Sequence, residues 1–223
     1  MATGVLQLTR LGHACVRLER HGARLVIDPG AYSAPDAVQG TDAVLVTHQH
    51  ADHVVPAALR HDMAARPGLE VWAPADVVHQ LLEGAPELEH RVHAVRAGST
   101  FEAGGFAVEV FGERHAVVHQ DLAPVANVAY LVDGAVLHPG DSFTVPPRAV
   151  DVLLAPVGAP WLRLGEVVDY IRAVAPRIVV PIHDALYSRV GCELVDRLLG
   201  PHGLGIGVAE YQRPPDGVPV DLG

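Results

Sequence analysis

Apolar residues recur along the chain in short strand-like runs, separated by a smaller number of helical stretches. Residues 4–30 alternate between apolar and polar positions as strands do, and His21-Gly22-Ala23 in their midst predicts a hairpin turn. Residues 42–48 form a β-branched run with few polar positions, which is typical of a strand buried on both faces. Further strands are predicted within residues 70–74, 90–116, 127–142, 149–157 and 177–184.

Helical spacing predicts four helices among these strands, over residues 54–66, 75–84, 163–175 and near 192–200. Pro56 stands in the first turn of the first helix, Pro67-Gly68 ends it, and Gly84 ends the second. Strand-rich stretches with interspersed helices indicate a layered α/β protein rather than a pure β-sandwich. We find no internal repeat, low-complexity tract or linker, so we expect residues 1–223 to form a single domain.

Polar side chains with metal-binding or catalytic chemistry follow these apolar runs directly. The positions that end such runs are Asp28, residues 48–53, His115, Asp141 and His183. In layered α/β folds, sites are built from residues at strand ends. The sequence therefore predicts that these distant positions share one site.

The composition excludes several classes of function. The 223-residue chain carries a formal charge of −10, from 26 acidic and 16 basic residues, and such a surface repels phosphate backbones. No apolar run is long enough to span a membrane, and residues 1–10 lack the features of a secretory signal. We expect a cytoplasmic protein with a small-molecule substrate and no nucleic-acid or membrane partner; homo-oligomerisation stays open. Cys15 and Cys192 are then expected to be reduced, as small apolar fillers, with one long-range disulfide between them as the alternative.

Histidine is unusually frequent, with 14 residues, and three of them crowd into His48-Gln49-His50-Ala51-Asp52-His53. One interpretation is a solvated loop whose histidines cap helix amides. The density of imidazole and carboxylate between a buried strand and a helix favours a metal site instead. A dinuclear site of this kind could share a hydroxide between its metals and clamp both the attacking and the leaving oxygen of a hydrolysis.

This six-residue stretch resembles the H-x-H-x-D-H signature of the metallo-β-lactamase fold hydrolases. Four further matches stand in the family's order: Asp28 in VIDPG, His115 in GERHA, Asp141 in HPGDS and His183 in PIHD. The resemblance covers most of the chain and implies a four-layer αββα sandwich of two mixed β-sheets flanked by helices. It also implies two divalent metal ions as cofactors, with Zn²⁺ first and Mn²⁺ or Fe²⁺ as alternatives.

The same resemblance assigns roles to individual residues. His48, His50 and His115 would bind one metal, Asp52, His53 and His183 would bind the other, and Asp141 would bridge the two. Asp52 and Asp141 would also be the catalytic carboxylates, and Asp28 would orient a ligand by hydrogen bonding. The alternatives are local: Asp28 as part of an Asp-Pro-Gly turn, and Asp141 as a turn or helix-cap residue.

The segment LGHACVRLE resembles the opening of a branch that includes ascorbate-6-phosphate lactonase, which makes His13 a candidate for contacting the metal ligands or the substrate. Similarity to that branch extends to residues 112–132 and adds His119, Asp121 and Asn127 as candidates to line or brace the pocket, and His138 to position Asp141. Each could equally be a loop residue with local bonds. Tyr32, Trp161, Arg163 and Tyr187 are further candidates for substrate contact, or alternatively packing or surface residues.

The implied activity is a metal-dependent hydrolysis in which a hydroxide bound by two metals cleaves a small ester, lactone or sugar-phosphate lactone. The bridging aspartate and the missing signal count against antibiotic hydrolysis, and the absent basic patch counts against nuclease activity. Only 40 residues follow His183, too few for the helical domain that glyoxalase II-like members carry. Two alternatives stay open: a phosphodiesterase acting on small nucleotides, and a non-catalytic metal-binding protein of the same fold.

Overall fold

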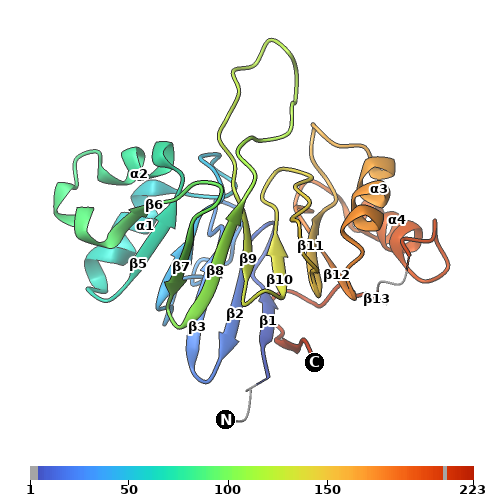
Figure 1. Ribbon diagram of the computed structural model, residues 1–223, viewed down its shortest axis with the longest axis horizontal. Helices are drawn as coiled ribbons and strands as arrows, with labels where there is room; N and C mark the ends of the chain where they lie inside the picture. Colours follow the sequence, from blue (N-terminus) through green and yellow to red (C-terminus); the bar gives the residue numbers. More distant parts are fainter. Residues whose placement is uncertain (1–4, 208–209) are drawn as a thin grey trace.

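The computed structural model describes residues 5–207 and 210–223, so Gly4, with which the predicted strand-like segment begins, lies outside the described residues. Two seven-stranded mixed β-sheets form its centre (Figure 1). The first has the strand order β14-β1-β2-β3-β4-β5-β6. Its strands are β1 (Gln7–Arg10), β2 (Val16–Arg20), β3 (Ala23–Ile27), β4 (Ala43–Leu45), β5 (Glu70–Ala73), β6 (Val92–Ala94) and β14 (Val220–Asp221).

The second sheet has the order β13-β12-β11-β10-β9-β8-β7. Its strands are β7 (Thr100–Ala103), β8 (Phe106–Phe111), β9 (Ala129–Val132), β10 (Val136–His138), β11 (Val152–Pro156), β12 (Ile178–Ile182) and β13 (Glu210–Tyr211). The helices are α1 (Pro56–Ala65), α2 (Ala75–Leu82), α3 (Leu164–Val174) and α4 (Arg189–Leu199), with a 3₁₀ helix η1 over Pro86–Arg91. Neither η1 nor the two-residue strands β13 and β14 were predicted from the sequence.

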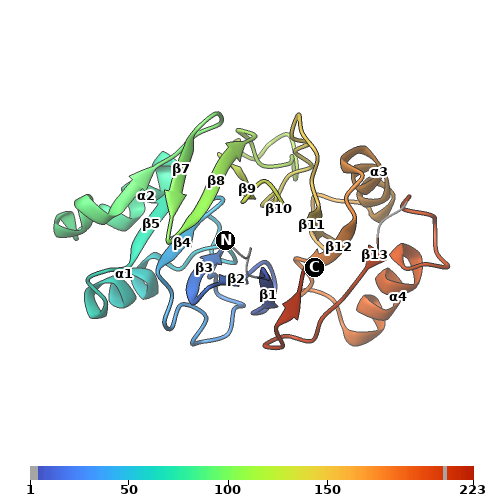
Figure 2. The ribbon, with the colours of Figure 1, turned by 60° about the horizontal axis from the view of Figure 1, so that its bottom comes forward.

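The layers follow from the alternation of side chains along the central strands. In β3, Leu25 and Ile27 enter the core between the two sheets, while Val26 packs with the helices that cover the first sheet. In β11, Leu154 enters the same central core and Leu153 packs beneath α3. Helices α1 and α2 lie on one outer side and α3 and α4 on the other (Figures 1 and 2). The expected four-layer αββα fold is confirmed.

Turn and cap chemistry sets two of the element boundaries. The predicted β2–β3 hairpin forms, but its loop is only His21 and Gly22, both with positive φ, and Ala23 already pairs with Arg20. The last helix, α4, begins before the predicted segment because Ser188 caps it, accepting the N–H of Gly191. Cys15 and Cys192 are both free thiols, and burial raises the pKa of Cys15 to about 12.

The strand directions bring the predicted site residues to one edge of the two sheets. Strand β3 pairs in parallel with β4, and β10 pairs in parallel with β11, which pairs in parallel with β12. Strand β9 is antiparallel to both β8 and β10, so the carboxyl ends of β8, β10 and β12 meet at the same edge. The loop 112–128, which joins β8 to β9, projects beyond this edge (Figure 1). Within the described residues, no helix has the length and apolar character needed to cross a bilayer.

Candidate metal centre

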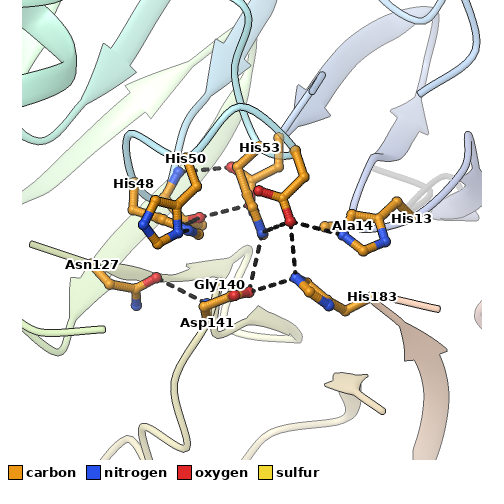
Figure 3. Close-up of polar contacts among 12 residues, drawn as sticks. His13, Ala14, His48, His50, His53, Asn127, Gly140, Asp141 and His183 are labelled. Carbon is orange, nitrogen blue, oxygen red and sulfur yellow. Dashed lines mark hydrogen bonds and ion pairs between the residues drawn. The ribbon is translucent and has the colours of Figure 1, made fainter. Parts of the chain in front are cut away.

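Eight side chains from five segments of the chain converge at this edge in two groups. In each group one potential ligand atom per residue lies within 4.8 Å of the others. Figure 3 labels His48, His50 and Asp141 of one group and His13, His53 and His183 of the other. The groups are His48, His50, His115 and Asp141, and His13, Asp52, His53 and His183. All seven candidate ligands are therefore brought together. The two sets of three that the resemblance implied stay together, Asp141 falls in the first group, and His13 joins the second.

The turn carrying His48 to His53 follows β4 and closes on itself, because the N–H groups of His53 and Val54 both donate to the carbonyl of His50, at 2.9 and 3.0 Å. Gly30 lets a second loop pack directly against this turn. A Cβ atom at Gly30 would lie 1.9 Å from the carbonyl oxygen of Asp52. The adjacent Ala31 N–H donates to Ala51 O at 2.8 Å. Gly30 thus holds the motif in place through backbone contact that only glycine permits.

Asp28 orients histidines of both groups from a fully buried position. Its Oδ2 accepts the Nδ1–H of His53 at 2.7 Å and the hydroxyl of Thr47 at 2.7 Å. Since the Thr47 hydroxyl donates to Asp28, it accepts from Nδ1–H of His48, 3.0 Å away. Both imidazoles are thereby held in the tautomer whose Nε2 is unprotonated; that atom of His48 lies 3.0 Å from Nδ1 of His50. The hydrogen-bonding role predicted for Asp28 corresponds to this geometry.

Two further histidines use Nδ1 in the same way. His115 Nδ1 donates to the carbonyl of Ala116 at 2.5 Å, and His183 Nδ1 donates to the carbonyl of Gly158 at 2.7 Å. Within the described part of the chain, Nε2 of His53, His115 and His183 is buried without any hydrogen-bond partner, as is Oδ1 of Asp141. Buried polar atoms are normally paired. Four such atoms aimed at one another fit a site for cations with nitrogen and oxygen ligands.

Asp141 lies between the two groups. Its Oδ1 is 3.1 Å from His53 Nε2 and 3.2 Å from His183 Nε2, whereas its Oδ2 is 3.3 Å from His115 Nε2. Trp161 Nε1–H donates to the same Oδ2 at 2.8 Å. One carboxylate therefore faces both clusters with different oxygens, which is the arrangement that a bridging ligand requires.

Asn127 and His138 fix the backbone around Asp141, and Figure 3 shows the side chain of Asn127 pointing toward Asp141. Asn127 Oδ1 accepts the N–H of Asp141 at 2.9 Å, and its Nδ2 donates to Pro139 O at 2.9 Å. His138 Nδ1 accepts the N–H of Gly140, while its Nε2 donates to Ala14 O at 2.8 Å. Burial lowers the pKa of His138, in keeping with this neutral bonding pattern. Both predicted bracing residues thus act on the turn that presents Asp141.

His13 braces Asp52. Its Nδ1 accepts the backbone N–H of Ala185 at 3.2 Å, so Nε2 carries the proton and donates to Asp52 Oδ2 at 3.1 Å. With neither nitrogen offering a lone pair to a cation, His13 is better suited to orient Asp52 than to bind metal. It also holds His183, whose N–H donates to the carbonyl of His13 at 2.9 Å. Both residues adopt positive φ, which is uncommon for residues other than glycine, although histidine tolerates it better than most.

The electrostatics of the centre favour positive charge at its middle. Burial lowers the pKa of His48 well below its usual value. Burial also acts to lower the pKa of His53 and His183, but the carboxylate of Asp141 outweighs it, aided by Asp28 and Asp52 respectively, and raises the pKa to about 10 and about 9. Burial opposes ionisation of Asp141, yet the adjacent imidazoles hold its pKa well below the usual range. The carboxylates thus attract cations, whether protons or metal ions.

A cavity of about 310 Å³ opens over the two groups. Its floor includes Asp52 and Asp141, and its walls include Tyr32, Trp161 and Leu186. Tyr32 and Trp161, which the sequence offered as candidates for substrate contact, line this cavity, and Trp161 also has the bond to Asp141. That bond has no sequence signature, because indole contacts depend on the fold.

Four other candidates lie outside the centre: His119, Asp121, Arg163 and Tyr187. His119 is largely exposed in the loop 112–128, and its Nδ1 accepts the N–H of Asp121, so both make only a local contact there. Arg163 is exposed at the start of α3, where it pairs with Glu166. Tyr187 packs against Gly158, and its hydroxyl donates to Val157 O. Sequence reasoning missed Thr47, whose only signal is a hydroxyl directly preceding the first histidine of the motif.

Known proteins resemble this chain over most of its length. Residues 7–183 match the family model described as the β-lactamase superfamily domain. Protein Rv0786c of Mycobacterium tuberculosis is 38% identical over 189 residues, covering 82% of this chain and 86% of its own. UPF0173 protein PF0020 of Pyrococcus furiosus is 30% identical, with 84% and 88% covered. UPF0173 metal-dependent hydrolase TK0141 of Thermococcus kodakarensis is 28% identical, with 78% and 82% covered.

A solved structure shares the fold. Igni18, a metallo hydrolase from Ignicoccus hospitalis, superposes with a TM-score of 0.70 at 20% identity, covering 96% of this chain and 97% of its own. The lactonase branch expected from the N-terminal segment is not among these similarities, and its substrate class is therefore not carried over from them. The family match, the relatives and the convergent ligand set agree on one conclusion: the chain belongs to the metallo-β-lactamase superfamily and, within it, to the UPF0173 family of metal-dependent hydrolases.

Proposed function

We propose that this metal-dependent hydrolase cleaves a small ester or lactone. The observation that carries the proposal is the set of unpartnered Nε2 atoms of His53, His115 and His183 around Asp141, directly beneath a cavity with largely apolar walls. Such a floor suits the polarisation of a carbonyl group, and such walls suit the uncharged remainder of an ester or lactone.

The cofactors we propose are two divalent cations, Zn²⁺ in the first place and Mn²⁺ or Fe²⁺ as alternatives, since all three accept imidazole and carboxylate. One would be held by His48, His50 and His115, and the other by Asp52, His53 and His183, with Asp141 shared between them. When bound, the cations supply a water molecule activated near neutral pH and a Lewis acid for the carbonyl oxygen.

The chain's own residues place the reacting groups and move the proton. Asp52 is partly exposed at the cavity floor, and the His13 N–H bond to Oδ2 fixes its orientation. We assign Asp52 the proton released when water adds to the carbonyl carbon. The same proton passes to the alcohol oxygen as the ester C–O bond breaks, so that acid and alcohol are the products. Trp161 and Asn127 hold Asp141 while this occurs.

The lining of the cavity bears on the substrate class. Among the described residues that line it there is no arginine, and the chain contains no lysine. A sugar-phosphate lactone or a nucleotide phosphodiester brings a phosphate dianion or monoanion that arginine or lysine normally pairs. This supports an uncharged ester or lactone over both of those substrates.

The test combines metal analysis of the purified protein with turnover of an ester, lactone, thioester and phosphodiester panel. We expect metal-dependent turnover of esters or lactones, and loss of both bound metal and turnover in His50→Ala and Asp141→Ala. His61→Ala, an exposed histidine on α1, is the matched control and keeps both. Turnover of bis(p-nitrophenyl) phosphate alone would establish the phosphodiesterase alternative. Full metal occupancy with no turnover across the panel would establish a non-catalytic metal-binding protein.

A further inference from the structure

The loop 112–128 carries exposed apolar side chains next to the metal centre. Val117 is 75% exposed, Val118 is 41% exposed and Leu122 is 59% exposed, all within six residues of each other. Large apolar side chains on a soluble protein are usually scattered singly, and a local concentration of them marks a binding site. The loop begins at the carboxyl end of β8 and contains His115, so these side chains are attached directly to the candidate ligand set.

The inner side of this loop encloses a second cavity, of about 520 Å³. Its apolar lining includes Val117, Val118, Leu122 and Val125, and its charged lining is Arg114 at the base of the loop. His50, His115 and Val118 line both this cavity and the one above the metal centre. The two cavities therefore adjoin at the ligands of one predicted metal, and a molecule held at the centre can extend beneath the loop.

The shape and chemistry of the adjoining cavities define what fits there. Each has a volume in the range of ordinary small-molecule pockets, and together they form a polar end and a larger, mainly apolar arm. A compact sugar would leave the apolar arm in contact with water. An unbranched hydrocarbon chain would cover Val117, Val118 and Leu122 and remove their exposed apolar surface from water.

We propose that the substrate is an ester or lactone with an unbranched acyl chain of medium length, whose carbonyl lies at the metal centre and whose chain lies in the cavity under the loop 112–128. This inference rests on the proposed hydrolase function and specifies its substrate. The occupant of the loop cavity is the acyl chain, and its recognition is hydrophobic, through the side chains of Val117, Val118 and Leu122.

The first experiment measures kcat/KM of the metal-loaded protein for p-nitrophenyl esters from acetate to octanoate. Burial of each methylene is expected to raise kcat/KM about fourfold until the cavity is filled. Leu122→Asp should reduce the octanoate-to-acetate ratio by at least about tenfold, because a carboxylate then lies along the chain. Leu122→Met should restore the ratio. Val190→Asp, which changes a residue 68% exposed on α4, is the matched control and keeps the wild-type ratio.

A second readout does not depend on turnover. Octanamide and butanamide are titrated into the protein while the fluorescence of Trp161, which lines the adjoining cavity, is followed in a Trp72→Phe background. Octanamide should bind at least about tenfold more tightly than butanamide, and Leu122→Asp should abolish the difference. Equal affinity for the two amides, together with a flat chain-length series, would overturn the acyl-chain assignment.

The hydrolase function and the acyl-chain site can each be disproved without the other. Metal-dependent turnover of short esters with no chain-length dependence leaves the hydrolase function standing and removes the acyl-chain site. Tighter binding of octanamide than of butanamide, without turnover of any ester, leaves the acyl-chain site standing and removes the hydrolase function. If the loop instead covers a second copy of this chain, Leu122→Asp will lower the mass in sedimentation without altering the amide affinities, and the proposal is then wrong.

Discussion

The carboxylate of Asp28 accepts a hydrogen bond from Nδ1–H of His53 at 2.7 Å, and both side chains are fully buried. This contact determines that Nε2 of His53 faces Asp141. Through the hydroxyl of Thr47, the same carboxylate also determines the tautomer of His48. A residue that touches neither cavity thus controls the availability of one ligand atom in each cluster.

Asp28→Asn should therefore weaken metal binding by about 10- to 100-fold, the usual effect of losing a partner that orients a ligand. Asparagine tolerates the positive φ of Asp28, so the backbone is preserved, but its amide directs a donor or a weaker acceptor at His53 and Thr47. Competition with a chelator measures the affinity. Asp133→Asn is the matched control, because Asp133 also has positive φ and lies outside the site; equal affinities in both variants would contradict this role for Asp28.

His13→Asn separates bracing from metal binding. Asparagine keeps the positive φ and removes the N–H that holds Asp52. We expect kcat to fall by about 10- to 100-fold with KM and bound metal nearly unchanged, because His13 offers no lone pair to a cation. Metal content by mass spectrometry and steady-state kinetics check this. Loss of one metal equivalent per chain would instead identify His13 as a ligand.

The extent to which the sequence predicts this molecule differs between its parts. The buried runs of β3, β4, β11 and β12 are apolar at nearly every position because they lie between two hydrophobic layers. Their strand character and the α/β class can therefore be predicted from the sequence. The histidine and aspartate positions can be predicted for a chemical reason: few sites other than metal centres need so many imidazole and carboxylate groups at such close spacing. The role of Gly30 and the bond from Trp161 to Asp141 were not predicted, because they depend on backbone approach and indole direction, which only the fold determines.

Local sequence was also a poor guide to distance from the centre. His119 and Asn127 both follow His115 within twelve residues. Asn127 returns to the sheet and is fully buried against Asp141, whereas His119 lies out on the loop 112–128 and is mostly exposed. The path of that loop separates them, and nothing in the residue types reveals where it turns back.

The stability of the metal-free protein should fall as the pH rises from neutral. His53 and His183 have folded-state pKa values of about 10 and about 9, above the ordinary value of 6.5. A raised pKa contributes stability that is fully present below pH 6.5 and is lost as the pH passes through 9 to 10. Calorimetry of the chelator-treated protein should show Tm decreasing across this window. The metal-loaded protein, in which cations replace these protons, should lack the decrease, and metal uptake should release protons at pH 7.

Gly30→Ala should disrupt the centre from a position that contributes no ligand. The added Cβ would lie 1.9 Å from Asp52 O and 2.4 Å from His53 N, so the turn carrying the motif must move away from the loop that supports it. We expect metal content to fall together with Tm. Gly68→Ala is the matched control, because a Cβ there meets nothing within 4 Å and the backbone is not in the left-handed region. Wild-type metal content in both variants would mean that the 28–33 segment can shift without moving Asp52, and that the motif alone determines the ligand geometry.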